Sequence, residues 1–354
     1  MIKKQIMDNP DIDIQEIKKL LKTEIKEVVG CTEPAGIAFA FSKCAEVLKV
    51  NHDFIDINKI HAKLTLSHDV YRNASTVTVP ILMQKGIKPA VSCGIYAAGN
   101  TLNVFSNVKI MKKKELIRLN NKRGWLKVVP LKRRGLFIRG ELKYGMDKVQ
   151  VMIEDKHDNI KRIILNKKVI YEKEDEQNFI IKNLQHIHEI VKIRDSDLED
   201  IAKYFIVNHG RNKEKYCQTD TADSVDKLIK MRMEGENLKI LTITGSGNQG
   251  IFLALPFYEI YKKDRNVLPA VLFSILTQIY LTQKKGRISG ICGMVNKVAP
   301  SLIAGLSYYN NAKLEDIKKK MKSVREKLKI LQCNGAKKSC SLKASLTLSR
   351  IMDI

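Results

Sequence analysis

The sequence lacks the segments that mark a protein for export or for a membrane. No N-terminal stretch combines basic residues, an apolar run and a cleavage site, so we expect a protein that is not secreted. The most apolar segment, Val267 to Leu281, is too short for a membrane span and contains the polar Ser274, Thr277 and Gln278, which predicts a buried helix. We therefore expect a cytoplasmic protein that does not enter a membrane.

Cysteines are few, and no C-x-x-C pair occurs among them. The seven cysteines are odd in number and show no disulfide-like spacing, which fits a reducing compartment. Three of them, Cys292, Cys333 and Cys340, lie beside glycine or in polar turns, where thiolates can converge on one soft metal centre. Three such ligands would leave one iron of a four-iron cluster open to a substrate. The alternative is a set of buried small hydrophobic residues, the usual role of an intracellular cysteine.

The chain also lacks an excess of acidic residues and a platform of aromatic ones. Its net charge is +25, and residues 109–173 carry 20 Lys and Arg against 7 Asp and Glu. These charges alternate with apolar residues at strand spacing, while Trp125, Phe137 and Tyr144 are scattered rather than grouped for base stacking. We expect a solvated sheet face rather than a nucleic-acid interface, with a weak polyanion contact as the alternative.

The apolar periodicity predicts an α+β protein, with one large or two modest domains. Asp13 to Gly30 has a capping box and helical spacing, and Pro34 suits the first turn of a second helix that runs to about Val50. Residues 57–80 and 125–171 alternate as strands do, and helical spacing returns from about residue 175. We predict a mainly helical catalytic domain, 1–54 and 172–354, that carries the cluster, and a β-rich inserted subdomain, 55–171.

Cys31 lies in a tight joint between the first two predicted helices. The dipole and free amides of the second helix N-terminus would favour its thiolate. A packed thiol in a helix turn explains the position equally well.

Residues 244–250 read Thr-Gly-Ser-Gly-Asn-Gln-Gly and match G-x-G-x-x-G. We do not favour a dinucleotide fold, because the motif comes late and no βαβ repeat surrounds it. A glycine nest is the better interpretation, in which backbone amides hold a small carboxylate together with Ser246, Asn248 and Gln249.

Three motifs taken together carry a resemblance to a known family. They are GCTEP at 30–34, GSGNQG at 245–250 and CNGAKKSCSLK at 333–343. In order and separation they resemble the iron–sulfur L-cysteine desulfidase family, which is similar to the α chain of bacterial iron–sulfur L-serine dehydratases. The resemblance spans nearly the whole chain and implies an oxygen-sensitive [4Fe–4S] cluster. It also implies β-elimination of L-cysteine to hydrogen sulfide, ammonia and pyruvate without pyridoxal phosphate.

The resemblance also implies roles for individual residues. Cys292, Cys333 and Cys340 fall on the cluster-ligand positions, and Cys31 falls on an active-site cysteine that we expect to act as the base. The expected substrate-binding residues are Asn73, His157, Ser246, Asn248 and Gln249.

The sequence departs from the family around two of these residues. The family usually has a glycine-rich run after its Lys-Asn pair, whereas here Arg72-Asn73 leads into Ala74-Ser75-Thr76. Lys156-His157-Asp158-Asn159 stands where Ser-His-Thr-Asn is expected. By residue type alone, a histidine in a turn is usually just solvated. These departures leave the substrate open.

Two alternatives to a cysteine desulfidase follow. The first is an iron–sulfur L-serine dehydratase that uses the same cluster. The second is a basic RNA-binding or redox-sensing protein whose cysteines hold a structural metal. For the enzyme we expect a small amino-acid substrate and a homo-oligomer, such as a dimer.

Overall fold

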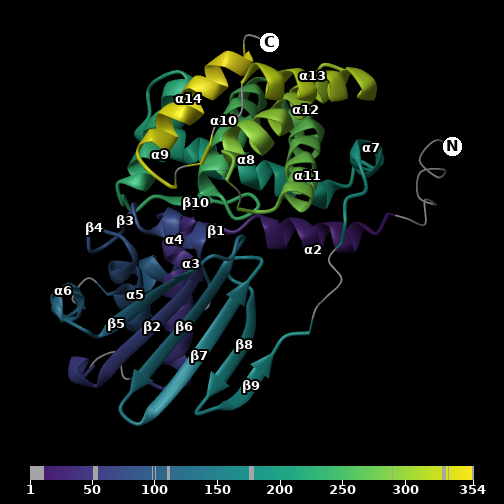
Figure 1. Cartoon of the computed structure of the whole chain (residues 1–354). Helices are drawn as coiled ribbons and strands as arrows, with labels where there is room; N and C mark the ends of the chain where they lie inside the picture. The colour runs from purple at the N-terminus through teal and green to yellow at the C-terminus, as the bar shows by residue number, and fades with distance from the viewer. Residues whose placement is uncertain are drawn as a thin grey trace.

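The computed structural model describes residues 12–50, 55–97, 99, 101–109, 112–174, 179–288, 290–328, 332–333 and 335–352. Figure 1 shows two lobes, one built on a β-sheet and one built of helices, with α2 lying between them. The mixture of helices and strands confirms the predicted α+β class. The predicted domain boundaries stay a prediction.

A six-stranded sheet forms the first lobe, in the order β5-β2-β6-β7-β8-β9. Strands β6 to β9 lie in the predicted strand-like stretch 125–171 and form an antiparallel meander, whereas β5 pairs in parallel with β2. The strands are β2 (Ile60–Ser67), β5 (Leu126–Leu131), β6 (Phe137–Tyr144), β7 (Asp147–Glu154), β8 (Ile160–Leu165) and β9 (Lys168–Glu172).

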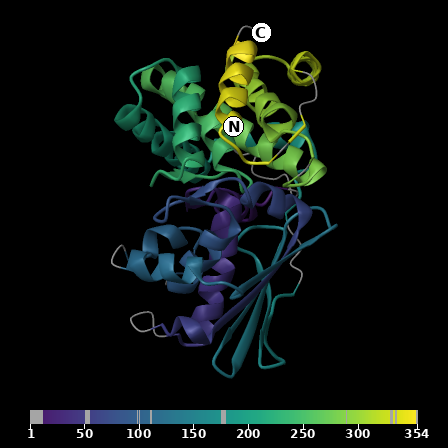
Figure 2. The ribbon, with the colours of Figure 1, turned by 60° about the vertical axis from the view of Figure 1, so that its left-hand side comes forward.

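Helix α3 (Thr32–Val47) packs on one face of the sheet, and α5 (Ile87–Tyr96) lies side by side with α3 (Figure 2). A Cβ on Gly94 would lie 2.3 Å from the carbonyl oxygen of Ala38, so glycine is what allows the two helices to cross so closely. Helix α3 belongs to the segment 1–54 of the predicted helical domain; it packs against β6 and β7 of the sheet, and most of its residues are buried.

The predicted β-like stretch 57–80 is interrupted by a helix. After β2 the chain forms α4 (His68–Ala74), where the Ser67 hydroxyl accepts a hydrogen bond from Val70 N. This cap turns the chain at a point where apolar alternation suggested a continued strand. The remaining elements on this side are β3 (Thr78–Val79), β4 (Gln84–Lys85) and α6 (Lys113–Asn121).

A short β-ladder joins the N-terminal segment to the helical lobe. Helix α2 (Ile14–Glu24) begins at the Asp13 cap but ends before Gly30, where we expected it to end. Residues 27–29 instead form β1 (Glu27–Val29), which pairs antiparallel with β10 (Lys239–Leu241). A partner more than 200 residues away in the sequence decides this conformation, so local spacing did not reveal it.

The second lobe is helical, and its core helix is α11 (Leu268–Lys285). With its preceding turn this segment, Arg265–Lys285, is long and apolar enough to cross a membrane, contrary to our expectation from length, but 78% of its apolar window is buried inside the protein. The surrounding helices are α7 (Leu184–Lys192), α8 (Ser196–Tyr216), α9 (Thr221–Met233), α10 (Gly247–Lys263), α12 (Ala299–Tyr309), α13 (Leu314–Lys327) and α14 (Ser339–Met352).

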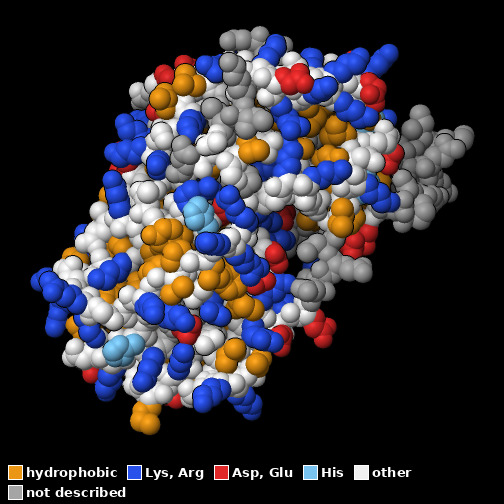
Figure 3. All heavy atoms as spheres, in the orientation of Figure 1, with side chains coloured by type: hydrophobic (Ala, Val, Ile, Leu, Met, Phe, Trp, Pro, Cys, Tyr) orange, Lys and Arg blue, Asp and Glu red, His pale blue; other side chains and the backbone are white. Residues whose placement is uncertain are grey.

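Lys and Arg side chains are spread over both lobes on the face seen in Figure 3. On the outer face of the sheet, the Glu141 carboxylate lies 2.7 Å from Lys148 Nζ and 3.6 Å from Lys63 Nζ, across three neighbouring strands. Part of the positive charge on the sheet is therefore compensated within the protein.

Candidate active site

A pocket of about 120 Å³ lies where the two lobes meet. This volume is below the range of drug-sized ligand sites, roughly 300–1,000 Å³, and suits a small molecule. All nine residues that we singled out from the sequence line it: Cys31, Asn73, His157, Ser246, Asn248, Gln249, Cys292, Cys333 and Cys340. The pocket brings these positions together; their roles stay predictions.

The three predicted cluster cysteines come from two chain segments that run side by side. Ile291 forms a β-bridge with Gln332, and Cys333 N donates to the Gly290 carbonyl oxygen at 2.8 Å. Cys292 precedes a π-helical turn over residues 294–298, a local irregularity that is frequent at functional sites. Cys340 lies in the first turn of α14. Asn334 of this motif lies outside the described residues.

The C-terminal cysteine loop is docked on α4 of the other lobe. Gly335 has a φ of +93°, and a Cβ there would lie 2.8 Å from the carbonyl oxygen of Arg72. Beside it, the Thr76 hydroxyl donates to the Ala336 carbonyl oxygen at 2.6 Å. These contacts bring Asn73, on α4, into the same pocket as the cysteines.

The sulfur donors fit a cluster better than a single ion. Within the described ranges, no three His, Cys, Asp or Glu side chains are grouped closely enough to hold one metal ion. Yet Cys292, Cys333 and Cys340 line one pocket, and burial together with the other thiols' charge raises the pKa of Cys292 and of Cys340. The ligands of a cluster bind separate irons, so they need not be grouped around a single ion. Metal binding would remove these protons, since the thiolate is the ligand.

Cys31 is the N-cap residue of α3, as the sequence suggested, but its thiol is not activated. Burial, followed by the Glu33 carboxylate, raises its pKa well above the usual value, while Arg232 acts in the opposite direction. Its S–H donates to Glu33 Oε2 at 3.2 Å. The prediction that the helix N-terminus stabilises a thiolate at Cys31 is therefore wrong. The cost of burying the charged thiolate exceeds the favourable effect of the helix N-terminus on its pKa.

Glu33 is a site residue that our sequence reasoning missed. Its other oxygen, Oε1, accepts a hydrogen bond from Asn73 Nδ2 at 2.9 Å, so one carboxylate joins Cys31 to α4. The signal was present, since Glu33 is part of the GCTEP motif, two residues after Cys31.

His157 lies at the turn between β7 and β8, yet it is only 2% exposed, which contradicts the solvated turn that its residue type suggested. Neither ring nitrogen has a hydrogen-bond partner among the described residues. Burial lowers its pKa to about 4, so the imidazole is neutral near pH 7. A Cβ on Gly245 would lie 3.0 Å from Nδ1 of His157. The ring therefore packs directly over residues 244–250, which we call the glycine loop.

The glycine loop leads into the N-terminus of α10. Thr244 and Gly245 have φ of +49° and +79°, and the Ser246 hydroxyl accepts a hydrogen bond from Gln249 N at 3.4 Å. Asn248 Oδ1 accepts from Arg232 Nη1, and Gln249 Oε1 accepts from Gln278 Nε2 at 2.6 Å. The two amide side chains that we expected to hold a carboxylate are thus already bonded within the protein.

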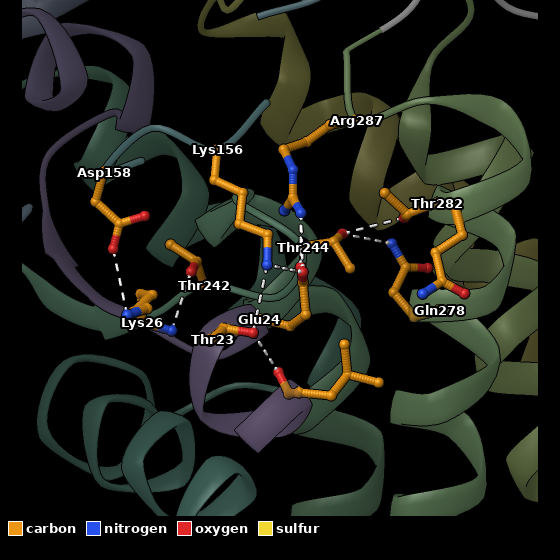
Figure 4. A network of polar contacts seen from close by, with 12 residues as sticks. Thr23, Glu24, Lys26, Lys156, Asp158, Thr242, Thr244, Gln278, Thr282 and Arg287 are labelled. Atoms are coloured by element: carbon orange, nitrogen blue, oxygen red, sulfur yellow. Dashed lines mark hydrogen bonds and ion pairs between the residues drawn. The ribbon is translucent and has the colours of Figure 1, made fainter. Parts of the chain in front are cut away.

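An ion-pair network ties the two lobes together beside the pocket (Figure 4). Glu24 accepts from Arg287 Nη2 at 2.9 Å and lies 3.0 Å from Lys156 Nζ, while its backbone oxygen accepts from Thr244 N at 3.0 Å. This network holds the hairpin that carries His157 against the glycine loop.

Comparison with known proteins identifies close counterparts of this chain. An L-cysteine desulfidase of Methanococcus maripaludis is 28% identical over 348 residues, covering 92% of this chain and 84% of that protein. A UPF0597 protein of Thermosipho africanus is 28% identical over 350 residues, covering 93% and 85%. A UPF0597 protein of Clostridium perfringens is 28% identical over 374 residues, covering 92% and 83%.

The family match covers most of the chain and all of the predicted site residues except Cys31. The family described as "Serine dehydratase alpha chain" matches residues 62–352, which include Asn73, His157, the glycine loop and the three cysteines. This agrees with the resemblance noted in the sequence. The chain belongs to the serine dehydratase alpha chain family.

Proposed function

We propose that this protein is an iron–sulfur lyase that converts L-cysteine to hydrogen sulfide, ammonia and pyruvate without pyridoxal phosphate. The observation that carries the proposal is the meeting of Cys292, Cys333 and Cys340 with Cys31 in one small pocket. Family membership and relatives named L-cysteine desulfidase support a lyase of this kind.

Cys292, Cys333 and Cys340 would hold a [4Fe–4S] cluster. Three protein ligands leave one iron without a side chain, and the bound cluster supplies a Lewis acid for the sulfur that leaves. Lys297 and Lys343 also line the pocket and would balance the negative charge of the thiolates.

The α-proton of the substrate must pass to a base in the pocket, a transfer that typically contributes roughly 10²–10⁴-fold. We assign this role to Cys31 acting together with Glu33. Glu33 Oε2, 3.2 Å from Cys31 Sγ, takes the thiol proton, and the resulting thiolate accepts the α-proton. The nearby guanidinium of Arg232, which lowers the pKa of this thiol, stabilises the thiolate.

The neutral ring of His157 would orient the substrate. Its two nitrogens lack protein partners, so one can accept a hydrogen bond from the substrate ammonium group. Loss of the α-proton and of sulfide gives aminoacrylate, which tautomerises and reacts with water to form pyruvate and ammonia.

The test is purification without oxygen, followed by measurement of iron, acid-labile sulfide and product release. We expect a brown protein with four irons per chain that forms sulfide and pyruvate in equal amounts from L-cysteine. Faster pyruvate release from L-serine would instead support the dehydratase. A salt-dependent shift on RNA, with no turnover of either amino acid, would contradict both enzymes.

A further inference from the structure

Arg232 is a buried cation that forms no direct ion pair with a carboxylate among the described residues. It lies in the last turn of α9, is 1% exposed and lines the pocket. Within the described part of the chain it forms no ion pair with an Asp or Glu side chain, and burying an unpaired charge is costly. A guanidinium in this setting can bind a carboxylate through charge-assisted hydrogen bonds.

The guanidinium is held in place by neutral acceptors. Nη2 donates to the Gly30 carbonyl oxygen at 2.6 Å, Nη1 donates to Asn248 Oδ1, and Nε has no partner. A Cβ on Gly247 would lie 2.6 Å from the Arg232 Cζ, so the glycine motif makes room for it. The side chain is therefore fixed while its charge and its Nε–H remain available.

The other cations of the pocket are committed elsewhere. Arg287 is paired with Glu24 at 2.9 Å. Lys297 Nζ donates to the carbonyl oxygens of Gly286 and Arg287 at 3.0 and 2.9 Å. The positive charge of Lys343 lowers the pKa of the Cys292 and Cys340 thiols. The same charge would balance the negative charge of these residues as cluster ligands.

We propose that Arg232 is the residue that binds the α-carboxylate of the amino-acid substrate, with Asn248 as its positioning residue. This inference rests on the proposed function and revises it, since we first assigned the carboxylate to the glycine loop and its side chains. Burial lowers the pKa of Arg232, and the nearby charges of Cys31, Glu33 and Cys340 raise it. A carboxylate bound to it would therefore place the α-carbon between the proposed base and the cluster cysteines. Guanidinium–carboxylate pairs are directional, so they fix orientation as well as affinity.

The binding of two small thiols can distinguish carboxylate binding by Arg232 from a general structural role of this residue. 3-Mercaptopropionate has the thiol and carboxylate of the substrate but no amine, whereas cysteamine has the thiol and amine but no carboxylate. Their binding to iron-loaded Arg232→Met and Arg232→Lys proteins can be measured by calorimetry, without any turnover. Arg350→Met, which removes an exposed cation outside the pocket, is the control.

We expect Arg232→Met to weaken 3-mercaptopropionate binding by roughly 10²–10³-fold, as for loss of one partner of a buried charge pair, and to change cysteamine binding little. Arg232→Lys should recover part of the loss, and the Arg350→Met control should bind the two thiols in the wild-type ratio. An equal loss for both thiols, or loss of iron from Arg232→Lys, would overturn the assignment. If the wild-type protein binds the two thiols in this pattern but releases no sulfide, the proposed reaction fails while the carboxylate site stands.

Discussion

Burial and the position at a helix N-terminus shift the pKa of the Cys31 thiol in opposite directions. The N-terminus of α3 favours a thiolate, but the side chain is only 5% exposed and is hydrogen-bonded to Glu33. Desolvation is the larger effect here, and it raises the pKa of the thiol. Chemistry at this position therefore depends on a partner that can take the proton.

Cys31→Ala should leave the iron content unchanged and lower turnover of L-cysteine by at least about 100-fold, because the proposed proton acceptor is gone. Glu33→Gln should lower turnover as well, since the amide can no longer take the thiol proton. The measurements are iron content, sulfide release and exchange of the α-proton with solvent. Loss of iron from Cys31→Ala would mean that this cysteine is a ligand, and unchanged turnover would make it an ordinary packed thiol.

At the scale of elements, the site depends on the docking of the cysteine loop onto α4. The loop approaches so closely that only glycine fits at 335, where both the φ of +93° and the nearby Arg72 carbonyl oxygen exclude a side chain. The same docking positions Asn73 against Glu33. The geometry of the proposed cluster ligands is therefore coupled to the sheet lobe.

Gly335→Ala should lower the iron content and the activity together, because the added methyl group would push the loop off α4. Gly124→Ala is the matched control: Gly124 also has a positive φ, +71°, but a Cβ there meets nothing within 4 Å. The control should lose about 1 kcal/mol of stability and keep its iron. Equal iron content in the two purified variants would show that docking does not govern the cluster site.

At the scale of the whole molecule, two buried histidines make stability sensitive to acid. His157 and His209 both have a pKa of about 4 because burial disfavours the imidazolium. His209 lies between two carbonyl oxygens, with Nδ1 2.8 Å from Phe205 O and Nε2 3.0 Å from Leu241 O. One neutral ring can donate to only one of them.

Stability should fall as the pH drops from about 6.5 toward 4, because the unfolded chain binds protons at both histidines while the folded chain does not. Above pH 6.5 both states are neutral at these sites, so the penalty is absent. Each histidine contributes a slope of up to about 1.4 kcal/mol per pH unit. Urea unfolding between pH 7 and pH 5 measures it, and His209→Gln should lower the slope. Constant stability over that interval would contradict buried neutral rings.

The predicted homo-oligomer and cytoplasmic location remain predictions. Sedimentation of the iron-loaded protein would measure the first. The spread of Lys and Arg over both lobes, with Glu141 paired across three strands, is consistent with a solvated surface.

The sequence by itself determined the features that depend on local spacing and residue type. Apolar periodicity predicted strands in residues 125–171 and the helices of the second lobe. The resemblance carried by the three motifs predicted the family and nine of the residues that line the pocket, but not Glu33 or Arg232. Only the tertiary structure decided what depends on distant partners. These features are the β1–β10 pairing, the packing of α3 on the sheet, the burial that keeps Cys31 protonated, and the unpaired charge of Arg232. The physical reason is that desolvation and charge compensation are set by everything packed around a group, which no local pattern contains.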